Sequence, residues 1–109
     1  MRQRTGILSD AEREMKKFVL LHYGFENPTP EIMQAWGKWF ESISEINIDQ
    51  GGFGAGREIS SSGTEDLSWG MESITGYNII KAESLDEAEK IAKNCPYVAG
   101  VRVYELREM

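Results

Sequence analysis

Apolar and polar positions alternate most clearly in the last third of the chain. Residues 74–82 are rich in strand-forming side chains. After Gly100, Val101 and Val103 alternate with Arg102 and Tyr104, which is the period of a half-buried strand. The pattern therefore predicts two strands, separated by about twenty residues that carry a different period.

The residues between these strands have the spacing of a helix. Ser84 and Glu87 form a capping box, in which each side chain satisfies the backbone N–H of the other residue. The apolar positions that follow share one helical face: Leu85, Ala88, Ile91, Ala92 and Cys95. Pro96 cannot extend a helix, so we expect this one to end at Asn94 or Cys95. The segment predicts strand, helix and strand in succession.

A second unit of the same kind opens the domain. Residues 17–23 predict a strand with both faces buried, as in the middle of a sheet. Thr29 is a suitable N-cap and Pro30 fits the first helical position. Apolar residues then follow helical spacing to about Asn47: Ile32, Trp36, Trp39, Phe40, Ile43 and Ile46. We expect this helix to pack on the sheet.

Residues 49–70 are the least regular part of the chain. We expect a strand around Gly52–Ile59, a turn at residues 61–63 and a loop, with a short hairpin as one way of arranging them. The glycines at 51, 52, 54 and 56 are not followed by Lys-Ser/Thr or by a helix start, which argues against a phosphate-binding loop. Glycines in a strand more often mark a bulge or a close approach of two backbones.

The order of elements predicts an α+β fold of the ferredoxin-like βαββαβ type. In that arrangement a four-stranded antiparallel sheet carries both helices on one face, and the two most apolar strands, residues 17–23 and 74–82, lie in its middle. The other face then needs a cover. A second copy of the chain is the simplest one, so we expect a homodimer.

Composition and charge narrow the class of protein. The length of 109 residues suits one domain, residues 15–109, and residues 1–14 are expected to be an N-terminal tail or a short helix. From residue 18 onward there are seven basic and fifteen acidic side chains, a net charge of −8, which disfavours nucleic acid as a partner. The single cysteine, the lack of a long apolar run and the lack of a signal-peptide core predict a cytoplasmic protein with no membrane partner.

Few residues of the chain are suited to catalysis. One histidine and one cysteine cannot make a structural zinc site, and no pattern indicates a metal or another cofactor. Cys95 lies on the apolar stripe of its helix, where a free thiol behaves as a small hydrophobic group. His22 is different, because an imidazole within FVLLHY must be either buried or facing a cavity.

His22 therefore has two interpretations. It is either a hydrogen-bonded core residue or a general base and ligand contact. If Tyr77 or Arg102 shares its face of the sheet, the three side chains form a pocket for a small anionic or phenolic compound, with Trp36 in the wall. With His22 in an open cavity, we expect His22→Ala to change stability by less than ~1 kcal/mol.

Three stretches resemble the YCII-related domain family, whose members often carry a DGPF motif: KKFVLLHYGF, TPEIMQAWGKWFESI and GYNIIKAESLDEAEKIAKNCPYVAGVRVYELR. Residues 64–67 stand where DGPF would be, so that motif is missing, and Glu72 matches a family glutamate. The resemblance implies a dimeric α+β barrel, in which two sheets face each other, with a cavity between each sheet and its cover. One branch of the family is thought to use a His and Asp pair for catalysis, and here the single histidine lies on the first strand.

Two functional hypotheses of different class follow. In the first, the protein binds or transforms a small organic molecule, with His22 as acid/base or orienting group and Trp36, Tyr77 and Arg102 as ligand contacts. In the second, it is a non-catalytic dimerisation or accessory module whose sheet face is filled with side chains. A cavity of ~300 Å³ or more beside His22 favours the first hypothesis.

Overall fold

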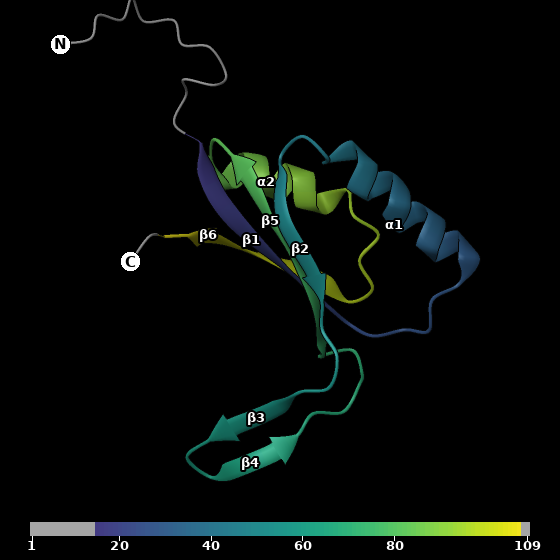
Figure 1. Ribbon diagram of the computed structural model, residues 1–109, viewed down its shortest axis with the longest axis vertical. Coiled ribbons are helices and arrows are strands. Elements are labelled where there is room, and N and C mark those ends of the chain that lie inside the picture. Colours follow the sequence, from purple (N-terminus) through teal and green to yellow (C-terminus); the bar gives the residue numbers. More distant parts are fainter. Residues whose placement is uncertain (1–14, 108–109) are drawn as a thin grey trace, which may run out of the picture.

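The computed structural model describes residues 15–107, so the predicted tail, residues 1–14, lies outside the described range. The elements are β1 (Lys16–Tyr23), α1 (Pro30–Ser42), β2 (Asn47–Gly52), β3 (Arg57–Ser60), β4 (Gly63–Asp66), β5 (Ile74–Ala82), α2 (Leu85–Lys93) and β6 (Gly100–Leu106). Four strands form one antiparallel sheet in the order β2-β5-β1-β6, and β3 pairs with β4 in a separate hairpin (Figure 1). The ferredoxin-like α+β fold is confirmed, with the hairpin inserted between β2 and β5.

The two most apolar strands, β1 and β5, form the middle of the sheet. β1 pairs with β5 on one side and with β6 on the other, and β2 completes the sheet beyond β5. Alternate residues of β1 point to opposite faces. Phe18 and Leu20 are fully buried on the face that carries the helices, whereas Val19 and Leu21 are only half-buried on the opposite face. We call this opposite side of the sheet the open face.

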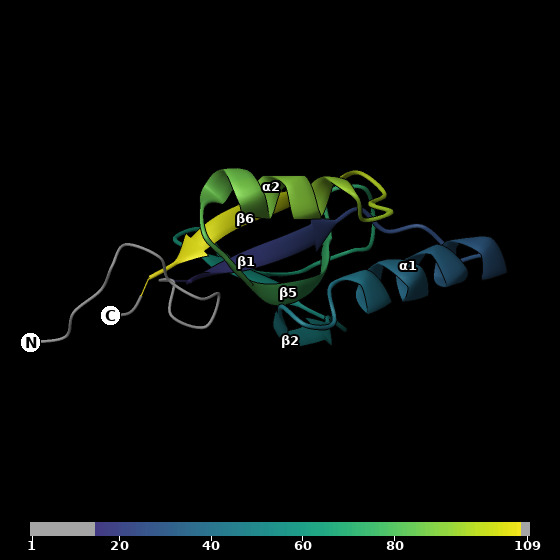
Figure 2. The same cartoon turned by 90° about the horizontal axis from the view of Figure 1, so that it is seen from above.

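Both helices contribute to the core on the same face of the sheet, at different distances from it. The buried apolar residues come from β1, β5 and both helices, and Trp39 of α1 donates from its indole N–H to the carbonyl of Ile91 in α2, at 3.2 Å. α2 lies directly against β1, β5 and β6. Figure 2 shows α1 farther out, to one side of the sheet, so its large side chains make the contact.

The first helix ends earlier than its apolar pattern predicts. It begins as expected, with the Thr29 side chain accepting from the N–H of Ile32, but it ends at Ser42 rather than near Asn47. Turns of hydrogen-bonded backbone then bring the N–H groups of Ile46 and Asn47 to the carbonyl of Ile43. These turns keep Ile43 and Ile46 on the core side, which is why the helical spacing extends beyond the helix itself.

The prediction of a single strand at Gly52–Ile59 is wrong, because this segment contains the end of one strand, a loop and the start of another. β2 ends at Gly52, residues 53–56 connect it to β3, and the hairpin of β3 and β4 extends away from the sheet (Figure 1). The expected close approach of two backbones is present where Gly51 meets Gly76, and the ring of Tyr77 also packs against Gly51. A Cβ at Gly51 would lie 2.7 Å from the ring of Tyr77, and one at Gly76 would lie 2.7 Å from the carbonyl oxygen of Gly51.

Gly37 lies in the exposed part of α1, where a methyl group would meet no atom within 4 Å. We expect Gly37→Ala to raise the free energy of unfolding by ~0.5 to 1 kcal/mol, because alanine loses less backbone entropy than glycine in a helix. Urea denaturation of the two proteins measures this change. Gly24→Ala is the control, since its positive φ of 101° and the nearby Ala99 backbone make a side chain unfavourable there. A loss of stability in Gly37→Ala would contradict the expectation.

Candidate functional site

A cavity of about 470 Å³ lies between α1 and the sheet. It occupies the space left because α1 does not pack directly on the strands. Its wall is built by the end of β1 with the loop that follows, one face of α1, the end of β2, the first half of β5, and the loop before β6. Aromatic and aliphatic side chains make up much of this wall: Phe25, Ile32, Trp36, Phe40 and Tyr97. Among the described residues that line it there is one carboxyl side chain, Glu26, and no lysine or arginine. In size and character it resembles a small-molecule site.

His22 contributes the imidazole of this wall. It follows Phe18 and Leu20 on the helix-covered face of β1, and it is 8 % exposed. Its ring meets the indoles of Trp36 and Trp39 edge-on, with centroids 5.1 Å and 5.9 Å away. Trp36 and Trp39 are three residues apart on α1, so one helix turn presents both rings to the histidine.

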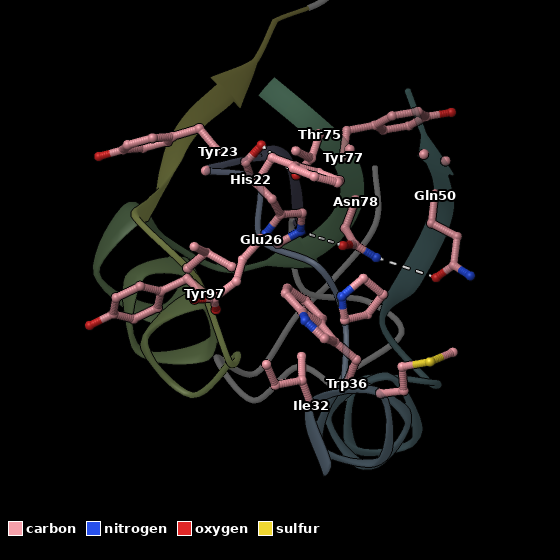
Figure 3. A pocket seen from close by; sticks show the side chains of 18 of the residues that line it. His22, Tyr23, Glu26, Ile32, Trp36, Gln50, Thr75, Tyr77, Asn78 and Tyr97 are labelled. Atoms are coloured by element: carbon pink, nitrogen blue, oxygen red, sulfur yellow. Dashed lines mark hydrogen bonds between the residues drawn. The ribbon is translucent and has the colours of Figure 1, made fainter. Parts of the chain in front are cut away.

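One nitrogen of His22 has a buried partner. Nε2 lies 2.7 Å from Oδ1 of Asn78, which is 1 % exposed on the neighbouring strand β5 (Figure 3). The two side chains share the helix-covered face, since Leu20 is opposite Asn78 in the register of β1 and β5. A buried amide and a buried imidazole thus satisfy each other inside an apolar core.

The amide group of Asn78 belongs to a larger cluster. Its Nδ2 donates to Oδ1 of Asn47 at 3.0 Å and to Oε1 of Gln50 at 3.3 Å. Asn47 in turn donates to Gln50 at 3.1 Å. Because Nδ2 of Asn78 donates to two residues of β2, the carbonyl oxygen of Asn78 is directed towards His22. The proton of the hydrogen bond between them therefore comes from Nε2 of the imidazole. We call Asn47, Gln50 and Asn78 the amide cluster.

The second nitrogen of His22 has no partner. Nδ1 is buried and makes no hydrogen bond to any described residue. Burial lowers the pKa of His22 below its ordinary value of 6.5, and the hydrogen bond to Asn78 only partly opposes this effect. The neutral imidazole is therefore favoured at pH 7, with an unshared electron pair on Nδ1.

The other predicted site residues are divided between the two faces of the sheet. Trp36 lines the cavity beside His22. Leu21, next to His22 on β1, is opposite both Tyr77 and Arg102, so these two side chains lie on the open face. The condition for a shared pocket, that Tyr77 or Arg102 lies on the face of His22, is therefore not met, because the register places both residues one position away from it.

Contacts on the open face agree with this placement. Tyr77 is among the residues that line the cavity, but its hydroxyl donates to Oδ2 of Asp49 at 3.0 Å, and Figure 3 shows its ring pointing away from His22. The Arg102 guanidinium lies over the ring of Tyr23, 5.1 Å from its centroid, and does not line the cavity. Neither side chain completes a pocket with the histidine.

One further group, outside the cavity, bears on the chemistry. Cys95 is buried, and burial raises the pKa of its thiol to about 11, so it is a poor nucleophile at neutral pH. Within residues 15–107, no three histidine, cysteine or acidic side chains are grouped so that they could hold a metal ion. No helix in the same range is long and apolar enough to cross a membrane.

The amide cluster was missed as a site by reasoning from the sequence. Asn78 carried a signal, because it interrupts the apolar strand GYNIIKA at a position that shares its face with Ile80 and Ala82. Asn47 and Gln50 carried none, since their segment was assigned to the end of a helix and to a loop. Their part in the site depends on the pairing of β2 with β5.

Fold and site together define a ferredoxin-like α+β protein with a lateral cavity that holds one histidine. Residues 17–109 match the YCII-related domain, so the chain belongs to that family. No curated protein matches the sequence. Among solved structures, it is similar to 5-chloro-2-hydroxyhydroquinone dehydrochlorinase (TftG) from Burkholderia phenoliruptrix AC1100 in complex with 2,5-dihydroxybenzoquinone. The TM-score is 0.57 at 17 % identity, over 85 % of this chain and 95 % of that chain.

Proposed function

We propose that the cavity binds a small planar organic molecule and that His22 acts on it as hydrogen-bond acceptor or general base. The observation that carries this proposal is the buried, unpartnered Nδ1 of His22 in the wall of a 470 Å³ cavity. A buried polar atom without a partner is unfavourable unless a ligand or a proton completes it. The cavity also exceeds the ~300 Å³ that favours ligand binding over a filled dimerisation face.

The chemistry available to such a site is proton transfer. Nδ1 takes the proton of a ligand O–H or N–H group with its free electron pair, and the imidazolium that forms keeps its other proton on Nε2, bonded to Asn78. Trp36 supplies a ring against which a planar ligand can pack. The solved dehydrochlorinase TftG, which has the same fold, is described with a quinone in its structure, and this supports an aromatic or quinonoid ligand.

Binding can be tested with p-cresol, 4-methylanisole and 4-methylbenzoate, followed by backbone amide NMR shifts. We expect p-cresol to shift residues of the cavity wall, and Trp36→Ala to weaken its binding about tenfold, as the loss of one aromatic contact and its buried area predicts. Phe53→Ala is the control, because this exposed ring stacks on Tyr77 outside the cavity. If none of the three compounds shifts the cavity residues at millimolar concentration, the proposal fails.

We extend the proposal to the quaternary structure, with a second copy of the chain covering the open face. Half-buried and exposed apolar or aromatic side chains collect there, with Val19, Ile79 and Tyr104 in register across three strands. Removing such a surface from water favours association by about 25 cal/mol per Å² of apolar area before the losses in entropy. The dimeric α+β barrel implied by the family resemblance would bury it between two sheets.

The dimer predicts a mass of twice 12.3 kDa in light scattering after size exclusion. We expect Tyr104→Asp to shift the equilibrium to the monomer, because it places a charge within the apolar row of the open face. Leu85→Asp is a matched control, since both side chains are 53 % exposed but Leu85 lies on α2, away from the open face. A wild-type monomer at tens of micromolar would contradict the homodimer.

A further inference from the structure

The amide cluster has a consequence for the kind of ligand that His22 accepts. In a neutral imidazole either nitrogen can hold the proton, and the hydrogen bonds around the ring decide which one does. Here both amide protons of Asn78 are directed to oxygen atoms on β2, 3.0 Å and 3.3 Å away. Only its oxygen is left for the histidine, and that oxygen requires a proton on Nε2.

The free nitrogen lies on the side of the ring opposite Asn78, and the atom itself is buried (Figure 3). Glu26 and Tyr97 line the cavity on this side of the ring. His22 is 8 % exposed, and two indoles pack against its ring in T-shaped arrangements. The imidazole therefore cannot turn freely to present its N–H to a ligand.

The charges of the cavity wall also favour an uncharged ligand. The described lining contains the carboxyl group of Glu26 and no lysine or arginine to neutralise an anion. The whole chain has a net charge of −6 as well. A carboxylate or phosphate ligand would lose its hydration without gaining a cationic partner, which is unfavourable.

We infer that the amide cluster holds His22 in the Nε2–H form, and that the cavity consequently selects uncharged planar ligands that donate an O–H or N–H to Nδ1. This inference rests on the proposed function and adds the ligand class to it. It also assigns Asn78 as a positioning residue, because it acts on the ligand through His22. Anionic compounds and ring compounds without a donor are expected to bind more weakly.

The protonation form can be measured without any ligand. The sequence contains a single histidine, so long-range proton–nitrogen NMR of the tag-free protein reports on His22 alone. We expect the signals of a neutral ring with the proton on Nε2 and a bare Nδ1 at pH 7.5. A ring with its proton on Nδ1, or a rapid average of the two forms, overturns the inference.

Ligand class is tested by three compounds that share one ring. We expect p-cresol to bind about fivefold more tightly than 4-methylanisole, in which a methyl ether replaces the donor, as the loss of one hydrogen bond predicts. We expect 4-methylbenzoate, which carries a charge, to bind more weakly still. If the ether equals p-cresol, or the benzoate exceeds it, the inference is wrong and the proposed function stands. If none of the three binds, both are wrong.

Two substitutions of Asn78 test its positioning role. Asn78→Leu removes the oxygen, so we expect a mixture of both neutral forms of His22 and a loss of the preference for p-cresol over the ether. Asn78→Asp keeps the oxygen in place and adds a negative charge, which favours the protonated ring. We expect this variant to hold the proton on Nε2 and to lose p-cresol binding at a higher pH than the wild type does. An unchanged NMR signal of His22 in a folded Asn78→Leu protein overturns the positioning role, and the wild-type measurements stand if neither variant folds.

Discussion

Replacing His22 with alanine is expected to lower the free energy of unfolding by ~2 to 4 kcal/mol, because the change opens a void and leaves a buried amide oxygen without its donor. This exceeds the change of less than ~1 kcal/mol expected from the sequence for a histidine in an open cavity. The reason is Asn78, which is 1 % exposed and bonds Nε2 at 2.7 Å. Denaturation in urea, with its linear extrapolation, measures the difference.

His22→Gln is the matched control, because its side-chain amide fills part of the space and can donate to Asn78. It should lose less stability than the alanine variant, and both should lose p-cresol binding. A loss below ~1 kcal/mol for His22→Ala would show that water from the cavity replaces the imidazole at Asn78. The change in stability reports on the hydrogen bond between His22 and Asn78, and the change in binding reports on the contact between His22 and the ligand.

The contribution of His22 also depends on pH, and its sign follows from the lowered pKa. The unfolded chain takes up a proton near the ordinary value of 6.5, while the folded chain resists protonation until a lower pH. The stability that comes from the neutral ring is therefore fully present above pH 6.5 and is lost as the pH falls towards the folded pKa. The difference between wild type and His22→Ala should shrink in this window, and a difference that grows on acidification would contradict the lowered pKa.

Replacing Trp39 with alanine is expected to have the largest effect on stability, a loss of ~3 to 5 kcal/mol. Its indole is 4 % exposed, lies in the apolar core, and donates to the carbonyl of Ile91. Because α1 stands apart from the sheet, this side chain links α1 to α2 through Ile91 and to β1 through the ring of His22. Thermal or urea denaturation of the purified variant measures the loss.

Trp36→Ala provides the comparison, since Trp36 lies one turn earlier on the same helix but is only half-buried, in the cavity wall. We expect a smaller loss of stability, ~1 to 2 kcal/mol, because less apolar area leaves the interior. Its main effect should be on ligand affinity. Equal losses in both variants would show that the cavity wall is as much a part of the core as Trp39 is.

Local patterns in the sequence were sufficient for most of the architecture. The capping box at Ser84, the N-cap at Thr29 and the alternation after Gly100 predicted elements that the structure contains, because these signals act between neighbours along the chain. The two most apolar strands were also correctly placed in the middle of the sheet, because the βαββαβ arrangement puts them there and a central strand is covered on both faces. The pattern failed between residues 43 and 60, where turns continue a helical spacing and the glycines are divided between the end of β2 and the loop that follows it.

Outside residues 43–60, the sequence by itself determined the elements and their order, and it also singled out His22 as the one chemically distinctive side chain. Only the tertiary structure decided what that side chain meets. A shift of one residue in register exchanges the two faces of a strand, so the separation of Tyr77 and Arg102 from His22 depends on the pairing of β1 with β5 and β6. The partner of Nε2 and the freedom of Nδ1 likewise depend on long-range pairing, because Asn78 and the rest of the amide cluster reach the histidine only across the assembled sheet.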